Sequence, residues 1–313
     1  MNLYSRKRVS SIRGMALLMV LAVVVLLSII VAGLWESTQP GWDESTLSRA
    51  RFQAGVLAES GANIASHPDV EPGDDALRHD FGNGRTYEVR ITTEGGRILV
   101  NDLADEKILN AVRELFILWG VDANSAAIAA ESIADWIDTD SDQRSNGAEN
   151  PFYAALDYEE FPPNQDFTSL EQLLFVRGMD QVAKIQPLWR DYFTVYGDGL
   201  IDVNSAPAQL LEAFFGTTAD AAVNLVVNRD GDDGVTGTFD DVRFEEVEQV
   251  QSLLGVSSAE WDEYSALVTL SGSLRRIESI GTIGDHRVKR ILLVQVTGEG
   301  RDETVTPVAR ISE

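Results

Sequence analysis

The sequence contains a run of acidic and amide side chains, DWIDTDSDQRSNGAEN, whose spacing is suited to binding a metal ion. Counted from Asp138, its polar residues fall at the positions that supply the ligands of a twelve-residue EF-hand loop. They are Asp138, Asp140, Asp142, Arg144 through its backbone carbonyl, Asn146 and Glu149. Because hard oxygen ligands suit calcium, we expect a structural Ca²⁺ site here. A solvated acidic turn is the alternative, since Gln143 stands where an EF-hand loop has glycine.

A second acidic run, NRDGDDGVTGTFDDV, lies further along the chain. Its carboxylates are Asp230, Asp232, Asp233, Asp240 and Asp241. They supply many oxygens, but their spacing fits no loop template well. We expect Asp230, Asp232 and Asp233 to form a second metal site, and a glycine-rich hairpin tip without metal is the alternative.

Composition argues against catalysis and against nucleic-acid binding. The chain carries 25 Lys and Arg against 50 Asp and Glu, and it has no cysteine. Phosphate binding needs a basic surface, and no basic stripe accompanies the helix-Gly-helix turns of this sequence. The histidines His67, His79 and His286 are scattered, and no glycine-rich phosphate loop or Gly-x-Ser-x-Gly elbow occurs. We therefore expect a binding or structural protein and no enzyme.

A long apolar run precedes these motifs. Residues 15–35 carry no charge and are long enough to cross a bilayer core of about 30 Å as a helix. Basic residues on the N-terminal side place that end in the cytoplasm and the acidic remainder outside it. The alternative is a secretory signal cut near residues 31–33, although an apolar run of about 21 residues exceeds the usual signal length. Pro40-Gly41 is expected to interrupt the helix.

A second helical pattern follows the apolar run. Leu47, Ala54, Leu57, Gly61 and Ile64 recur at helical spacing, and small residues are frequent among them. Such a face packs closely against a neighbour, which is either the protein's own core or a partner subunit. We expect partners to bind along this face.

The rest of the chain predicts strands at both ends and helices between them. TYEVRITTEGGRILVN alternates apolar and polar residues and predicts a hairpin that turns at residues 94–96, and strand patterns return after residue 267. Between these segments, helix-Gly-helix patterns predict a compact all-helical module. This order favours an α+β fold in which residues 103–264 are inserted into a small sheet domain of residues 36–102 and 265–313.

Five segments of the chain resemble the type II secretion system protein K family, the large minor pseudopilins. They are RGMALLMVL, GGRILVNDL, IADWIDTDSDQRSNGAENPFY, SLEQLLFVRGM and LIDVNSAPAQLL, in family order. The resemblance implies a type IV pilin-like core, in which a long N-terminal transmembrane helix packs on a small antiparallel sheet, with a large inserted all-α domain. It also implies calcium binding, in agreement with the spacing in the Asp138 loop.

The resemblance further implies how the chain is processed and where it acts. Residues 1–14 correspond to a prepilin leader, which prepilin peptidase removes between Gly14 and Met15 before it methylates Met15. The helix of residues 15–35 then remains in the inner membrane as a single span, with the large domain in the periplasm. The implied partners are I-like and J-like minor pseudopilins in a tip complex, and the major pseudopilin.

Met19 is a departure from most pilin-like subunits. They carry a glutamate at the fifth residue after the cut, whose carboxylate meets a neighbour's N-terminal amine, and this chain has Met19 there. A buried unpaired amine costs of the order of several kcal/mol, so a subunit without the acid packs poorly beneath another. Its absence is typical of the K family and implies a place at the pseudopilus tip, where the subunit would help initiate assembly for export of folded proteins across the outer membrane. The alternatives are a minor tip subunit of a type IV pilus or related filament, and a membrane-anchored calcium-binding module with no filament role.

Overall fold

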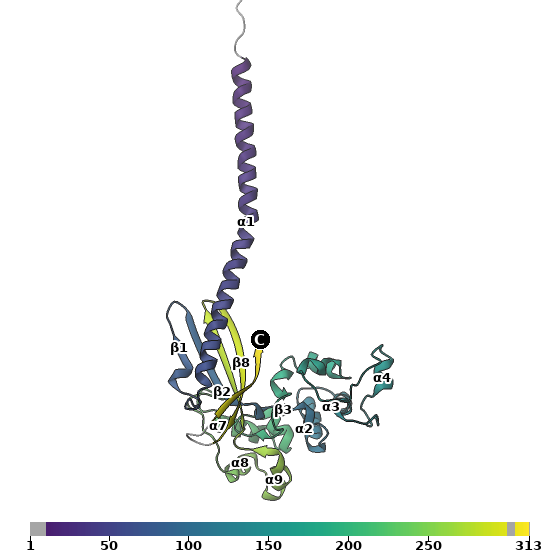
Figure 1. Ribbon diagram of the computed structural model, residues 1–313. Helices are drawn as coiled ribbons and strands as arrows, with labels where there is room; N and C mark the ends of the chain where they lie inside the picture. The colour runs from purple at the N-terminus through teal and green to yellow at the C-terminus, as the bar shows by residue number, and fades with distance from the viewer. Residues whose placement is uncertain (1–10, 299–303, 313) are drawn as a thin grey trace, which may run out of the picture.

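The computed structural model describes residues 11–298 and 304–312, the side chains of residues 11–18, 32–46 and 312 excepted. Its first element, helix α1 (Ser11–Ala65), extends away from the molecule along its first half and packs on a sheet near its end (Figure 1). The helix continues through Pro40, so the expected interruption at that residue is wrong. A proline inside a helix removes one backbone hydrogen bond and can bend the helix without ending it.

An antiparallel sheet receives the second half of α1. Within the described residues its strands are β1 (Arg78–Asp80), β2 (Arg85–Thr93), β7 (Leu274–Ile283), β8 (His286–Thr297) and β9 (Thr304–Ser312). They lie in the order β1-β2-β7-β8-β9. The pairing of β2 with β7 joins two distant parts of the chain, with Ile91 opposite Ile277. Everything between these two strands is therefore inserted into one sheet.

Very small residues allow α1 to lie directly on the backbone of the sheet. A Cβ added to Gly281 of β7 would lie 1.9 Å from the carbonyl oxygen of Ala54 and 2.5 Å from the nitrogen of Ala58. A Cβ added to Gly61 of α1 would lie 2.6 Å from Ser279 Oγ. Glycine is the one residue that permits such an approach, so these two positions set the distance between helix and sheet.

Apolar side chains close the rest of this interface. The buried cluster consists of Ala62, Ala65, Leu77, Tyr87, Val89, Ile91, Ile277, Leu292 and Val294. Its members on β2 alternate with exposed or half-exposed residues, as expected for a strand with one face on a core. The cluster excludes water from one face of the sheet and holds the end of α1 in place.

The chain does not turn back after β2 as the sequence predicts. It leaves the sheet through a 3-10 turn, η2 (Glu94–Gly96), and forms β3 (Ile98–Leu99), which pairs in parallel with β4 (Phe193–Thr194). A Cβ added to Gly96 would lie 2.6 Å from the carbonyl oxygen of Ser205. The glycines taken as a hairpin turn therefore allow two backbones to approach where the chain crosses between modules.

Residues 98–270, here called the helical module, contain short helices. Its α-helices are α2 (Glu106–Leu118), α3 (Ala123–Ile137), α4 (Asn150–Ala154), α5 (Met179–Ile185), α6 (Ala208–Phe215), α7 (Ala219–Arg229), α8 (Val247–Leu254) and α9 (Ser258–Tyr264). Its 3-10 helices are η3 (Val100–Asp102), η4 (Leu170–Phe175), η5 (Trp189–Tyr192) and η6 (Ser265–Leu267), and η1 (Asp75–Leu77) lies outside it. A parallel pair, β5 (Ile201–Asp202) and β6 (Val268–Thr269), completes the module.

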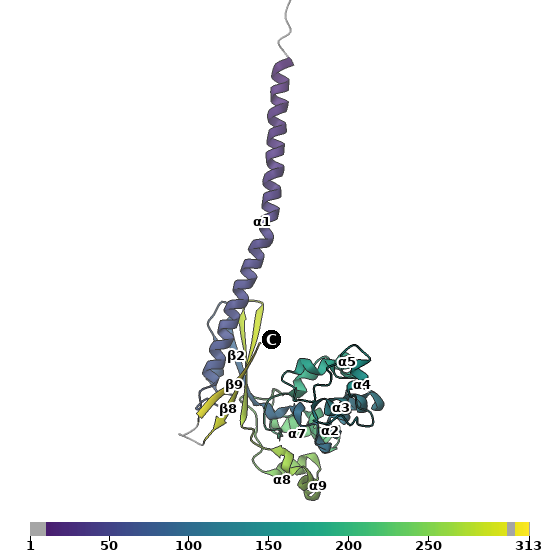
Figure 2. The ribbon, with the colours of Figure 1, turned by 45° about the vertical axis from the view of Figure 1, so that its right-hand side comes forward.

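The helical module has its own hydrophobic core. Large buried side chains such as Trp136, Trp189 and Phe116 belong to a cluster that is separate from the one beneath α1. Figures 1 and 2 both show the module at the end of the sheet opposite to the free stretch of α1. The predicted α+β class is confirmed by this combination of sheet and helices.

The expected transmembrane span lies only partly within the described side chains. Within the side chains that are described, no helix is both long and apolar enough to cross a membrane. Residues 1–10 of the expected leader are outside the described residues, and the side chains at the Gly14-Met15 junction are not described either.

The contact between α1 and β7 predicts the effect of one methyl group. Changing Gly281→Ala forces a Cβ against backbone atoms of α1, which cannot move away as a flexible side chain can. Such overpacking costs about 1–3 kcal/mol, so the free energy of unfolding should fall by about this amount in denaturant titrations of the purified protein.

The matched control is Gly55→Ala on the same helix. Its added Cβ would have Arg290 Nη2 at 3.4 Å as nearest atom, which is ordinary contact. Alanine is also the better helix former, by about 1 kcal/mol, so this variant should be as stable as the parent or more stable. Equal stabilities of the two variants would disprove the proposed constraint.

Candidate functional site

The first acidic loop connects α3 to α4 in the helical module. Asp138 is the residue at the end of α3 and adopts an extended backbone, and Glu149 immediately precedes α4. Pro151 lies in the first turn of α4, where the missing amide hydrogen costs nothing. The two helices thus hold the first and last predicted calcium ligands at the two ends of one loop.

Buried polar atoms without a hydrogen-bond partner gather around this loop. Seven such side-chain atoms occur in the part of the chain that the structure describes, and six of them belong to residues 132–164. Three are oxygens suited to a cation: Asp138 Oδ1, Glu149 Oε1 and Asn164 Oδ1. Because an unpaired buried oxygen is unfavourable, their grouping indicates a site for a positively charged or hydrogen-bonding ligand.

The carboxyl groups of the loop also disturb one another electrostatically. Burial, with repulsion from Asp135 and Asp138, raises the pKa of Glu149 to about 7. Burial, with repulsion from Asp138, raises the pKa of Asp135 to about 6, although hydrogen bonding to Arg144 opposes the shift. Burial and the neighbouring Asp140 raise the pKa of Asp138 as well. These groups therefore form one negative centre that a bound cation would stabilise.

Two of the predicted ligands make contacts with other residues of the chain. Arg144 binds Glu106 through Nη1 at 2.8 Å, and its carbonyl accepts a hydrogen bond from Gly147 at 3.2 Å. The Asn146 side chain donates to Glu131 Oε1 at 2.8 Å. Gln143, which stands where an EF-hand loop has glycine, donates to the Gly147 carbonyl at 2.8 Å. The role of Arg144 and Asn146 as calcium ligands stays a prediction, because the oxygens that would bind the ion are the Arg144 carbonyl and Asn146 Oδ1.

Asp140 and Asp142 lie on the exposed side of the loop. Asp140 Oδ1 accepts a hydrogen bond from the Asp142 amide at 2.8 Å, which is a turn within the loop. The charge of Asp140 reaches both Asp138 and Glu149, since it contributes to raising the pKa of each. Asp140 is thus near the buried oxygens, and Asp142 is next to Asp140.

Two residues of this site were missed by the sequence analysis. Asp135 is fully buried within the apolar stretch of α3, and a carboxylate among such neighbours was a detectable signal. Asn164 has a left-handed backbone with φ of 51° and follows two prolines, and nothing in the sequence connects it with the loop. Its Nδ2 donates to the carbonyl of Asp140, which places the Asn164 side chain against the loop.

Acidic side chains alone do not complete a metal site. Within the described ranges, no three His, Cys, Asp or Glu side chains converge closely enough to hold a metal ion. Calcium commonly takes amide and backbone carbonyl oxygens besides carboxylates, and Asn164 Oδ1 is such an oxygen.

The second acidic loop is held together by its own carboxylates. Asp230 forms a buried ion pair with Arg229, at 2.6 Å, and accepts a hydrogen bond from Thr236 at 2.9 Å. Asp240 Oδ2 accepts the backbone amides of Asp232 at 2.7 Å and Asp233 at 3.1 Å. The prediction that Asp230 binds a metal is therefore corrected, because Arg229 already neutralises its carboxylate.

Arg229 explains why this loop lies where it does. Its Nη1 donates to the carbonyls of Val203 at 2.8 Å and Ala206 at 2.7 Å, so it ties the loop to the chain that precedes α6. Asp233 accepts the Val235 amide at 2.8 Å and the Thr238 hydroxyl at 2.9 Å. These bonds give the acidic residues a structural role in the turn.

The small-residue face of α1 is turned toward the sheet of the same chain. Ala54 and Gly61 are fully buried, and Leu57 packs partly against the cluster beneath the helix. The prediction that Ala54 and Gly61 bind a partner is therefore wrong, since close packing is satisfied within the chain. Leu47 is half-buried, and Ile64 is 37% exposed.

Where α1 packs on the sheet, its opposite face exposes two large apolar side chains. Phe52 is 72% exposed and Val56 is 49% exposed. Residues four apart lie on the same side of a helix, so the two form one apolar strip on the described surface.

Comparisons with known proteins agree on a family. A family model described as "Type II secretion system (T2SS), protein K" matches residues 96–189. The type II secretion system protein K of Dickeya chrysanthemi is 37% identical over 68 residues, which are 22% of this chain and 18% of that relative. The matched segment therefore spans less than a fifth of the relative's own length.

A solved structure is similar along nearly the whole fold. A chain in the crystal structure of the GspK-GspI-GspJ complex from the enterotoxigenic Escherichia coli type 2 secretion system aligns with a TM-score of 0.58. The alignment covers 90% of this chain and 99% of that chain, at 17% sequence identity. The family model includes the first acidic loop and the helices on both sides of it, so residues 96–189 of this chain match the type II secretion system protein K family.

Proposed function

We propose that this chain is a non-enzymatic minor pseudopilin of a type II secretion system. It would form a tip complex with an I-like and a J-like minor pseudopilin and help initiate the pseudopilus that exports folded proteins across the outer membrane. The observation that carries the proposal is the fold, which follows a chain of the GspK-GspI-GspJ complex over 90% of its length. The family model at residues 96–189 supports the same assignment.

The shape of the molecule suits a subunit at the end of a filament. Helix α1 extends away from the sheet at one end, and the helical module lies at the other (Figure 1). In a filament built from packed N-terminal helices, a bulky module in this position would obstruct a further subunit above it. The absence of a carboxylate at Met19 supports the same place.

We infer that α1 anchors the protein in the inner membrane after processing. Residues 15–35 would form the span, the large domain would lie in the periplasm, and prepilin peptidase would cut between Gly14 and Met15. The support is the uncharged stretch and its basic flank, since charged residues are costly within a bilayer.

The mass of the mature N-terminus tests this processing. We expect mass spectrometry of the protein purified from membranes to find a chain beginning at methylated Met15. A Gly14→Asp variant should keep its leader, because the residue before the cut is changed. A parent chain that begins at Met1, or near residues 31–33, would contradict the proposed processing.

We also propose that the first acidic loop binds one calcium ion that stabilises the helical module. Asp138, Glu149 and Asn164 would hold it, with Asp140 beside them. The buried unpaired oxygens and the mutual repulsion of the carboxyl groups support this assignment. The ion would supply positive charge where the chain has carboxylates, and so allow them to be ionised when buried.

Calcium titration of the Glu149→Gln variant tests the site. The change keeps the size of the side chain and removes its charge, so calcium affinity measured by calorimetry on the full chain in detergent should fall by roughly tenfold or more. Glu114→Gln is the matched control, because Glu114 lies on α2 and its carboxylate meets Arg113 at 3.8 Å. Equal heats for parent and Glu149→Gln would remove the site.

The pH dependence of the calcium effect follows from the same group. Without calcium, the pKa of Glu149 rises from 4.5 to about 7 on folding. The protonated carboxyl group therefore favours the folded state at low pH, and this contribution to the free energy of unfolding is lost as the pH rises to about 7 and the group ionises. Calcium replaces the proton, so it should raise the melting temperature more at about pH 8 than at about pH 5. In Glu149→Gln this difference should shrink.

We place a partner contact on the exposed strip of α1, Phe52 and Val56. Exposed aromatic side chains are the usual anchors of protein interfaces. Phe52→Asp should therefore weaken binding to the I-like and J-like subunits by about tenfold or more in pull-down titrations. Gln53→Asp adds the same charge at a neighbouring exposed position and should have little effect. An equal loss of binding in both variants would show that the added negative charge on the helix weakens binding, and that Phe52 makes no specific contact.

A further inference from the structure

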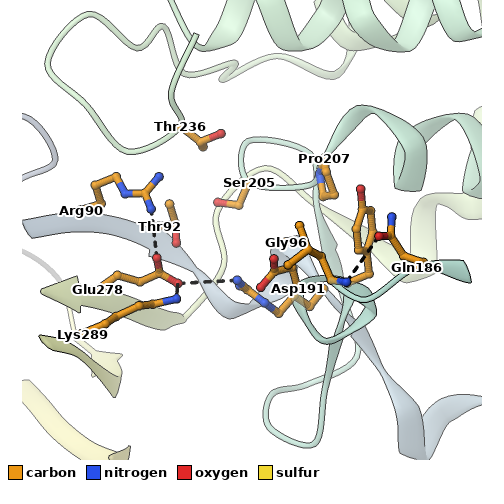
Figure 3. A pocket seen from close by; sticks show the side chains of 13 residues that line it. Arg90, Thr92, Gly96, Gln186, Asp191, Ser205, Pro207, Thr236, Glu278 and Lys289 are labelled. Atoms are coloured by element: carbon orange, nitrogen blue, oxygen red, sulfur yellow. Dashed lines mark hydrogen bonds and ion pairs between the residues drawn. The ribbon is translucent and has the colours of Figure 1, made fainter. Parts of the chain in front are cut away.

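A cavity of about 340 Å³ lies between the sheet and the helical module (Figure 3). The sheet contributes Arg90 from β2 and Lys289 from β8, and the segment after η2 contributes Arg97. On the other side, Leu188 and Ser205 of the helical module line the cavity. None of the proposed calcium ligands or of the α1 strip belongs to it.

Cations surround one carboxylate at the floor of this cavity. Figure 3 shows the Glu278 side chain between those of Arg90 and Lys289. The distance from Glu278 to Arg90 Nη2 is 3.3 Å, to Arg97 Nη2 3.7 Å and to Lys289 Nζ 3.9 Å. All three are longer than a good charge-assisted hydrogen bond of about 2.8 Å.

Glu278 is already bound more tightly by another residue. The buried Arg276 donates to it through Nε at 2.7 Å and to Glu94 through Nη1 at 3.0 Å. Burial lowers the pKa of Arg276, but these two carboxylates outweigh burial and raise it. Both carboxylates of the floor are therefore largely used by Arg276, and little of their negative charge remains for Arg90 and Arg97.

Arg97 is the least compensated of these groups. Its nearest carboxylates are Glu94 at 3.8 Å and Glu278 at 3.7 Å, and in the described part of the chain its guanidinium makes no hydrogen bond. Burial and the charge of Arg276 lower its pKa despite the nearby acids. A guanidinium offers five donors in a planar fork that fits a carboxylate with two parallel bonds, so Arg97 has unused capacity for one.

Arginine side chains gather at this cavity in a chain that is strongly acidic. Arg90 and Arg97 line the cavity and Arg276 pairs with the carboxylates of its floor, whereas the whole chain has a net charge of −25. Guanidinium groups that face one cavity offer an anion several donors in one place. At the rim, Leu188 is 65% exposed, which adds an apolar contact next to the charged floor.

We propose that this cavity receives a carboxylate side chain from an acidic segment of a partner protein. The carboxylate pairs with Arg97 and Arg90, and an apolar neighbour in the same segment packs on Leu188. This inference rests on the proposed function, because the partner is taken to be one of the two minor pseudopilins. The apolar rim beside a charged floor favours a polypeptide over a free small anion.

Charge removal in the cavity tests the proposal. Arg97→Gln and Arg90→Gln, in the full chain in detergent, should each raise the Kd for the purified I-like and J-like subunits, by about tenfold for Arg97. Arg113→Gln is the control, because it removes the same charge from α2, where Arg113 meets only Glu114 at 3.8 Å among the described residues. The Kd of the parent should rise with salt more steeply than that of Arg97→Gln.

A charge exchange identifies the partner group. Arg97→Glu should abolish binding, and one acidic-to-arginine change in the partner should restore it. If Arg97→Gln fails to fold, Arg90→Gln decides, because the Arg90 side chain is 41% exposed.

An unchanged Kd in both glutamine variants overturns the proposal. If succinate in addition gives a heat of binding that Arg97→Gln abolishes, the cavity serves a free dicarboxylate instead of a partner protein. A parent chain that binds neither minor pseudopilin would instead overturn the proposed function.

Discussion

The direct contact of α1 with the backbone of β7 is the constraint on which the rest of the structure depends. Gly281 and Gly61 leave no room for a side chain between helix and strand, and the apolar cluster then closes around them. Because β7 pairs with β2, this contact also holds together the two points where the chain enters and leaves the helical module. A long helix and a large module are thereby attached to opposite ends of one small sheet.

Charged groups join the two modules where hydrophobic packing is interrupted. The Glu94, Arg276 and Glu278 cluster lies where β2 gives way to η2, and Thr93 Oγ1 donates to Asp202 Oδ2 at 2.5 Å across the same boundary. Buried charges of this kind contribute little net stability, but they penalise any arrangement that leaves one unpaired. They therefore define how the sheet and the helical module are oriented relative to each other. The cavity lined by Arg90 and Arg97 lies beside this charged cluster.

The two acidic loops look alike in sequence and differ in the structure. In the second loop, Arg229 and the backbone amides satisfy the carboxylates, so the turn is complete without a ligand. In the first loop, Asp138 and Glu149 keep buried oxygens without partners, and burial together with repulsion from neighbouring carboxylates raises the pKa of both groups. The difference is one of available donors, and it is the reason that we propose calcium for the first loop alone.

The sequence by itself determined the α+β class, the strands of the C-terminal part and the acidic residues around Asp138, because periodicity and charge spacing are local properties of the chain. Only the tertiary structure decided what lies opposite each residue. In that structure Ala54 and Gly61 face the sheet, and Asn164 contacts a loop that is distant from it in sequence. Asp230 forms an ion pair with Arg229. The tertiary structure also replaced the expected hairpin after β2 with a crossing between modules. Such pairings depend on contacts between distant segments, which no local pattern encodes.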